Sequence, residues 1–149
     1  MLFIDEWVLE RLTAVMGDPD LVHDGLVTLE RPGPGEPVVV RYPMPYVVYA
    51  SNLGDTSNAR LAKRHRRHST FWSLMVVGLD RTQVKAALED IRADLHHTRP
   101  AIAGYKFWPV SLEESQRVRR DDDAINVDGS PLFYGVDNYA VAHQLKSVA

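Results

Sequence analysis

The histidines of this 149-residue chain are its first candidates for metal chemistry. His65 and His68 are three residues apart, a spacing at which two imidazoles on one helix face can chelate a metal ion. The other residues of the run 63–68 are all lysine or arginine, and their charges repel a cation. His96 and His97 stand at the end of a predicted helix, where basic side chains interact favourably with the helix dipole. The histidine spacing therefore predicts no metal site.

Three consecutive aspartates, Asp121, Asp122 and Asp123, offer the hard oxygen ligands that divalent cations prefer. They lack the alternating spacing of a calcium-binding loop and a suitably placed distal glutamate. Arg119 and Arg120 precede them and can pair with them. We interpret the run as a polar turn between strands, and a role at a protein interface is its best functional alternative.

Motifs for nucleophilic catalysis and phosphate binding are not found in the sequence. It has no Gly-x-Ser-x-Gly elbow, and His23-Asp24 is a common dipeptide, whereas catalytic triads assemble in space. The segment 32–35, Pro-Gly-Pro-Gly, lacks the Lys-Ser/Thr pair of a phosphate-binding loop. The chain contains no cysteine, which excludes disulfides, thiolate nucleophiles and cysteine-bound zinc. We therefore expect neither an enzyme nor a bound cofactor.

A basic segment is the strongest charged feature of the sequence. Five lysines or arginines fall within eight positions of a chain whose net charge is −3. Such a segment can bind phosphates, dock on an acidic protein surface or remain solvated. It has no aromatic residue on which bases could stack. With the acidic run and its arginines, it gives the candidate interface residues: Arg60, Lys63, Arg64, Arg66, Arg67, Arg119, Arg120, Asp121, Asp122 and Asp123.

The bulk composition, 45% hydrophobic and 25% charged residues, is typical of a soluble globular protein. The N-terminus reaches acidic residues too early for a signal peptide. The longest apolar run, residues 74–77, is far shorter than the roughly 20 residues of a membrane span. We expect a protein without membrane contact, made and kept in cytoplasm-like conditions.

The segment from Thr70 to Leu95 predicts the scaffold that positions these charges. Residues 70–78 are mostly apolar and aromatic, as in a strand, and Asp80 is suited to start the helix that follows. Apolar residues spaced by three and four give this helix one buried face, formed by Val84, Ala87, Leu88, Ile91 and Leu95. A helix that lies back on the preceding strand builds a two-layer core.

A first helix is expected over residues 2–16, because the sequence Gly17-Asp18-Pro19 ends it. Its broad apolar stripe is centred on Leu2, Leu9, Leu12 and Met16, with further apolar residues near the edges, namely Ile4, Trp7, Val8 and Val15.

The remaining strands are expected over residues 38–42, 46–49, 106–110, 117–120 and 133–141. The first of them is an edge strand, because prolines follow it. In the last, Phe133, Tyr139 and Val141 face one way, and Asp137 breaks the alternation. Residues 111–114 are expected to form a turn, residues 121–131 a polar loop, residues 51–69 a long loop and residues 143–149 an extended tail.

This order of elements predicts an α+β fold in a single domain, residues 1–149. The expected architecture is a single mixed, mostly antiparallel sheet of about five to six strands, with two main helices packed on one face.

Several segments, by their order and their residue types, resemble those of a known protein family. They are Pro45–Tyr49, the aromatic strand Phe71–Gly78, the helix start Asp80–Gln83, the run Arg120–Asp122 and the segment Pro131–Tyr139. Together, over roughly residues 38–141, they resemble the tail terminator proteins of long-tailed phages (siphoviruses), especially those that infect actinobacteria.

The resemblance implies a virion protein of the neck, made in the host cytoplasm. It implies a hexameric ring that caps the tail tube, ends its polymerisation and presents a surface to the head-side connector or stopper protein. DNA passes through the ring without sequence-specific binding, and no reaction is catalysed. A ring requires a heterologous contact between different patches of neighbouring subunits. We hypothesise that in this contact the acidic run 121–123 pairs with Arg64, Arg66 or Arg67 of an adjacent subunit.

Other functions remain open at this stage. The chain could be another head–tail connector component, such as a stopper or tail completion protein. It could be a small nucleic-acid-binding domain that uses the basic loop 60–68, whose affinity would fall steeply with salt. An enzyme whose site is assembled in space would need a deep pocket with perturbed titrating groups.

Overall fold

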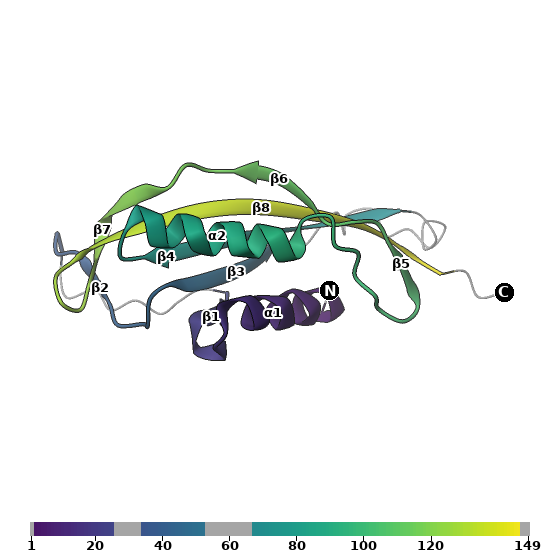
Figure 1. The fold of residues 1–149 in the computed structure, drawn as a ribbon, viewed down its shortest axis with the longest axis horizontal. Coiled ribbons are helices and arrows are strands. Elements are labelled where there is room, and N and C mark those ends of the chain that lie inside the picture. The colour runs from purple at the N-terminus through teal and green to yellow at the C-terminus, as the bar shows by residue number, and fades with distance from the viewer. Residues whose placement is uncertain (1, 26–33, 53–66, 147–149) are drawn as a thin grey trace.

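The computed structural model describes residues 2–25, 34–52 and 67–146, over which the chain forms two α-helices, a short 3-10 turn and eight strands (Figure 1). In chain order they are α1 (Leu2–Met16), η1 (Pro19–Leu21), β1 (Val22–Asp24), β2 (Val38–Val40), β3 (Tyr46–Asn52), β4 (His68–Gly78), α2 (Arg81–Leu95), β5 (Tyr105–Phe107), β6 (Ser111–Ser115), β7 (Arg119–Asn126) and β8 (Pro131–Leu145).

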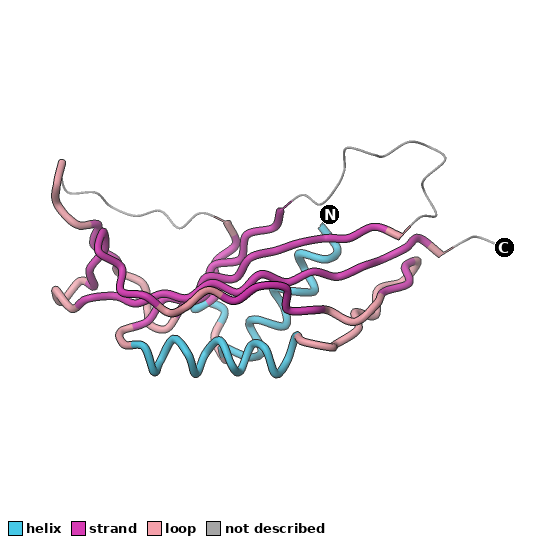
Figure 2. Tube along the Cα trace, turned by 90° about the horizontal axis from the view of Figure 1, so that it is seen from above, coloured by secondary structure: helices cyan, strands magenta, loops and turns pink. Residues whose placement is uncertain are grey.

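The described strands belong to one mixed sheet. Their order is β1-β3-β4-β8-β7-β2, and β5 and β6 also pair with β8. Only the pairs β1–β3 and β2–β7 are parallel among them. Both helices lie on the same side of the sheet (Figures 1 and 2). The predicted α+β class is confirmed, whereas the expected five to six strands are too few for a sheet of eight.

Strand β8 is the axis of this sheet. One of its edges pairs with β4, from His68 opposite His143 to Gly78 opposite Phe133. Its other edge pairs in turn with β5, β6 and β7. Between these short strands, the amide of Trp108 donates to the carbonyl of Ala142 at 2.9 Å. Residues 105–126 therefore run alongside β8 as three short strands separated by interruptions.

Several of the boundaries predicted within residues 105–126 are wrong. Residues 111–114, expected as a turn, lie in strand β6, and Asp121–Asp123, expected in a polar loop, lie in β7. The predicted strand 106–110 is only Tyr105–Phe107. Strand β6 is mostly exposed, so that pairing with β8 holds it and no apolar alternation marks it in the sequence.

The predicted loop and tail are also shorter than expected. Strand β3 continues to Asn52 and β4 begins at His68, so residues 51–69 are not wholly a loop. Strand β8 extends from Pro131 to Leu145, so residues 143–145 are part of the sheet.

Helix α2 begins and packs as predicted. The Asp80 carboxylate accepts the amide of Gln83 at 2.7 Å, and the Gln83 side-chain oxygen accepts the amide of Leu79 at 2.7 Å. These two bonds satisfy backbone donors at the helix start. Its buried residues are the five of the predicted face. The helix lies close to β8 at Gly135, where a Cβ atom would come within 2.7 Å of the Leu88 side chain.

The buried stripe of α1 differs from the predicted one. Ile4, Val8 and Leu12 are fully buried, whereas Leu9 and Met16, which were expected at its centre, are only partly buried. Most of the circumference of this helix is apolar, so its pattern does not fix which stripe faces the sheet. The hydroxyl of Tyr49 in β3 donates to the Asp5 carboxylate and joins α1 to the sheet.

A second apolar cluster shows that the sheet is curled. Val38 and Val40 of β2, at one end of the strand order, share this cluster with Tyr46 and Val48 of β3. Val47 and Tyr49 face the helices instead, so the second cluster lies on the opposite face. The curl buries β2, which the sequence correctly places at an edge.

A bidentate ion pair fixes α2 to β8. Asp137, the residue that breaks the apolar alternation of β8, is fully buried. The Arg92 Nε and Nη2 atoms donate to its two carboxylate oxygens at 2.6 and 2.8 Å, and Nη2 also donates to Ser115 Oγ of β6 at 2.6 Å. Hydrogen bonding to Asp137 raises the pKa of Arg92. The buried charge is therefore fully paired, as stability requires.

We expect Arg92→Met to lower the free energy of unfolding by about 3 kcal/mol, because the buried Asp137 carboxylate loses its partner. The double variant Arg92→Met/Asp137→Leu should be more stable than the single variant, since it removes the stranded charge as well. Urea denaturation measures both. Arg11→Met is the matched control, because the Arg11–Asp94 pair is longer, 3.3 Å, and partly exposed, and should cost less than about 1 kcal/mol. Equal losses at the two pairs would contradict this account.

Candidate functional site

The acidic run is displayed by a bulge in β7. Asp121 lies opposite Leu132 of β8, but Ile125 already lies opposite Pro131. The residues between them are therefore excluded from the regular ladder. Asp122 and Asp123 are exposed, and the Asp123 amide donates to the Asp121 carboxylate at 2.9 Å. The run expected as a turn is an irregular strand that presents two carboxylates to solvent.

The three aspartates differ in burial, because Asp121 is partly buried whereas Asp122 and Asp123 are exposed. Burial, followed by the charge of Asp121 and the neighbouring Tyr42, raises the pKa of Tyr46 to about 12. Asp121 therefore lies near the second apolar cluster, to which Tyr46 belongs. Arg119 and Arg120 are exposed beside the bulge. This end of the sheet, with Asp121, Asp122 and Asp123, is called the acidic end below.

The basic end of the sheet is built around Trp108. The Arg67 guanidinium lies 4.6 Å from the centre of the Trp108 ring, and the Lys106 ammonium lies 5.0 Å from it. Both cations are exposed, and the indole is half-buried. Two cations that share one aromatic ring create a positive surface that favours an anionic partner. The predicted residues Arg60, Lys63, Arg64 and Arg66 lie outside the described residues.

The two charged ends lie at opposite ends of β8. Arg67 precedes His68, which is opposite His143, whereas Asp121 is opposite Leu132. These two positions on β8 are 11 residues apart, which at about 3.3 Å per residue is roughly 35 Å. Arg67 and the acidic run therefore do not meet within one subunit. The predicted site residues form two surfaces rather than one.

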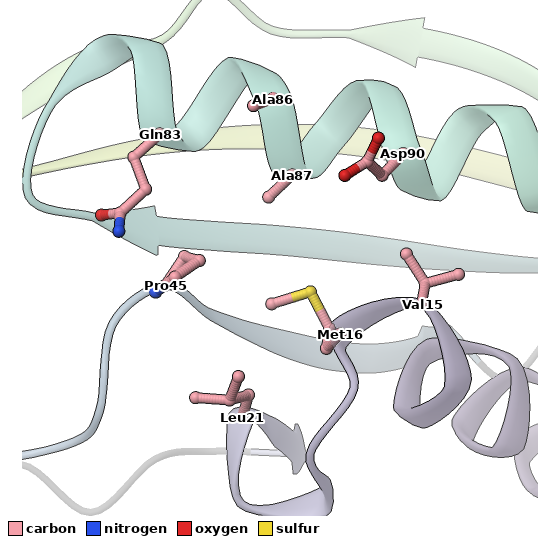
Figure 3. A pocket seen from close by; sticks show the side chains of 8 residues that line it. All are labelled: Val15, Met16, Leu21, Pro45, Gln83, Ala86, Ala87 and Asp90. Carbon is pink, nitrogen blue, oxygen red and sulfur yellow. The ribbon is translucent and has the colours of Figure 1, made fainter.

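A shallow depression lies on the helical side near the acidic end. It has a volume of about 240 Å³ and is lined by Val15, Met16, Leu21, Pro45, Gln83, Ala86, Ala87 and Asp90 (Figure 3). Pro45 directly precedes Tyr46, whose ladder partner Val77 lies opposite Tyr134 of β8. The depression and the acidic run therefore share one end of the sheet.

The residues that the structure describes contain no group of three or more histidine, aspartate or glutamate side chains placed to hold a metal ion. None of the described helices is both long and apolar enough to span a membrane. His96 and His97 are neighbours at the end of α2, where the His96 Nδ1 atom accepts the amide of Leu112 at 3.1 Å.

Sequence reasoning missed Lys106, Trp108 and the depression. Lys106 and Trp108 were recognised only as strand residues, because their position beside Arg67 depends on the pairing of β5 with the end of β8. The depression joins three segments that are distant in sequence, around residues 15–21, 45 and 83–90. A lysine two residues before a tryptophan is the signal in the sequence that could have added Lys106 and Trp108 to the basic end.

The sequence matches no protein-family model and no curated protein. Among solved structures, the fold is similar to a chain of the virion of a native gene transfer agent particle, with a TM-score of 0.54 and 15% sequence identity. The match covers 93% of this chain and 92% of that chain. At this identity the similarity concerns the fold, and it extends over nearly the whole of both chains.

The basic end should be sensitive to acid. Burial and the neighbouring His68 lower the pKa of His143, whose Nε2 atom lies 2.9 Å from the Thr70 hydroxyl. Below a pH of about 6.5 the unfolded chain then binds a proton that the folded chain does not. The stability that this histidine contributes is complete above that pH and is lost as the pH falls through its lowered folded pKa.

We expect His143→Gln, which keeps a hydrogen-bonding group beside Thr70, to reduce the loss of unfolding free energy between pH 7.5 and 5. The reduction is at most about 1.4 kcal/mol per pH unit, the limit for one proton. Chemical denaturation at several pH values measures it. His97→Asn removes an exposed histidine and serves as the control. Identical pH profiles for the parent protein and His143→Gln would refute the assignment.

Proposed function

We propose that this chain is a structural protein of a phage-like virion, and specifically a tail terminator of the siphovirus type. In this proposal six copies form a ring at the neck that caps the tail tube, ends its polymerisation and joins it to the head-side connector. DNA passes through the ring, and the chain catalyses no reaction. The observation that carries the proposal is the fold similarity to a virion chain over 93% and 92% of the two lengths.

The distribution of charge supports assembly through unlike surfaces. The exposed carboxylates of Asp122 and Asp123 and the cations of the basic end lie at opposite ends of the sheet. A surface that is complementary to a different surface of the same chain gives a heterologous contact, and a closed set of such contacts is a ring. Charge complementarity would also orient the copies as they meet.

Deletion of the gene tests the position in the particle. We expect particles made without this protein to show tails of abnormal length that are not joined to heads, because the tube is not capped. Electron microscopy measures tail length and attachment, and re-expression of the protein is the control. Tails of normal length that merely fail to join would assign the chain to another connector component. Normal particles would refute the structural role altogether.

Charge reversal tests the contact between subunits. We expect Arg66→Glu/Arg67→Glu to reduce ring assembly, with a larger effect at low salt, since exposed charges are screened at high ionic strength. Adding Asp122→Lys/Asp123→Lys to the same chain should restore assembly. The two surfaces of each contact have then exchanged their charges and are again complementary. Native mass spectrometry measures the oligomers, and Lys85→Glu on α2 is the control.

Unchanged assembly of the Arg66/Arg67 variant at low and high salt would contradict the pairing. Loss of assembly in both variants, without any recovery on charge exchange, would also contradict it. In either case the position of the chain in the particle would be tested separately by the gene deletion.

A further inference from the structure

The depression between the two helices has the chemistry of a site for one long basic side chain. Its lining is mostly apolar and comes from α1, η1, Pro45 and α2, and Asp90 is the one acidic residue among the lining side chains (Figure 3). Gln83 is occupied, because its oxygen accepts the amide of Leu79. Lysine and arginine bury an aliphatic stem along such walls and keep the charged group at a polar rim. The volume, about 240 Å³, is smaller than a typical small-molecule pocket.

The seam between α1 and α2 shows why Asp90 lacks a cation. One helical turn further along α2, Asp94 pairs with Arg11 of α1 at 3.3 Å. Four residues after Arg11, α1 presents Val15 instead of a basic residue, and Val15 and Asp90 both line the depression. Among the residues that the structure describes, Asp90 makes no ion pair. A cation from outside the subunit would repeat the neighbouring contact at this position.

The N-terminal segment, which supplies Val15, Met16 and Leu21 to one wall of the depression, is strongly acidic. Residues 2–24 contain six acidic residues, Asp5, Glu6, Glu10, Asp18, Asp20 and Asp24, and only one arginine or lysine, Arg11. The charged partner that this segment favours is therefore basic. The chain carries its own densest block of cations at residues 60–67.

Arg67 of the same subunit lies too far from the depression to fill it. Arg67 adjoins His68 at one end of β4, whereas the depression adjoins Tyr46, whose partner Val77 is at the other end. His68 and Val77 are nine residues apart in one strand, roughly 30 Å. Arg67 can therefore fill the depression only of another molecule.

We propose that the depression between α1 and α2 receives a lysine or arginine side chain from residues 60–67 of a second copy of this chain. The aliphatic stem packs between Val15, Met16 and Leu21, and the charged group pairs with Asp90. The inference rests on the proposed ring, for which it supplies a contact on the helical side of the acidic end. It places the basic segment of one subunit over the helices of the next.

Disulfide cross-linking tests the contact. Because the sequence contains no cysteine, the introduced residues are the only thiols that can react. Copies carrying Asp90→Cys are mixed with copies carrying Lys63→Cys, Arg64→Cys, Arg66→Cys or Arg67→Cys, assembled and mildly oxidised. We expect a disulfide-linked dimer for at least one pairing. Glu89→Cys is the matched control, because it neighbours Asp90 in α2 but does not line the depression, and it should not cross-link.

A charge variant gives a second measurement. Asp90→Lys should weaken association at least about tenfold, a change of about 1.4 kcal/mol, whereas Glu89→Lys should change it less than about twofold. Both residues are exposed on one helix, so circular dichroism and thermal unfolding should show that both variants are folded.

Oligomers that form without cross-linking at residue 90, or that tolerate Asp90→Lys as well as Glu89→Lys, would overturn the docking contact and leave the proposed ring standing. A chain that never forms an oligomer, even in assembled particles, would overturn both. Cross-links from residues 89 and 90 alike would also overturn the contact, because they would show proximity without the specific insertion.

Discussion

The 15-residue strand β8 is the constraint on which the other elements depend. Its edge toward β4 is paired over 11 residues, and its other edge is shared by three short strands. Its helix-facing side must accept both the close approach of α2 at Gly135 and the buried charge of Asp137. The Arg92 guanidinium resolves this conflict by linking α2, β8 and β6 through one group. Arg92 therefore does more than neutralise Asp137, because its hydrogen bonds also fix the register of α2 against β8.

The same strand determines where the charges lie. A long, nearly continuous ladder separates whatever is attached to its two ends, so the Trp108 cluster and the bulge of β7 are held roughly 35 Å apart. The curl of the sheet adds a second constraint, because it turns β2 onto β3 and buries Val38 and Val40. The acidic end is therefore a packed structure on both faces of the sheet. A surface whose backbone is already packed in this way would lose less conformational entropy on association than a flexible one.

The sequence allows local features to be predicted better than distant pairings. Helix α2 was predicted with its cap and its five buried residues, because both depend on residues close in the chain. The strand β6 was missed, because its polar residues are held by β8, some 25 residues later. In α1, apolar residues around most of the helix left the buried stripe undetermined until the sheet was placed. Asp137 was noticed only as an exception, since its partner Arg92 is on another element. Of the candidate site, Arg67 and the acidic run were found by charge alone, whereas Trp108 and the depression required the tertiary structure.

A ring built from these surfaces would use individually weak contacts. Exposed ion pairs contribute at most about 1 kcal/mol each, and a single contact between two copies would be short-lived in dilute solution. The last contact that closes a ring is different, because both of its surfaces are already held on one assembly at a high effective concentration. A template that holds several copies side by side supplies the same advantage before closure. In the proposed ring, weak, charged, heterologous surfaces would keep the copies apart until a tube end gathers them, and apolar surfaces of the same area would not provide this restraint.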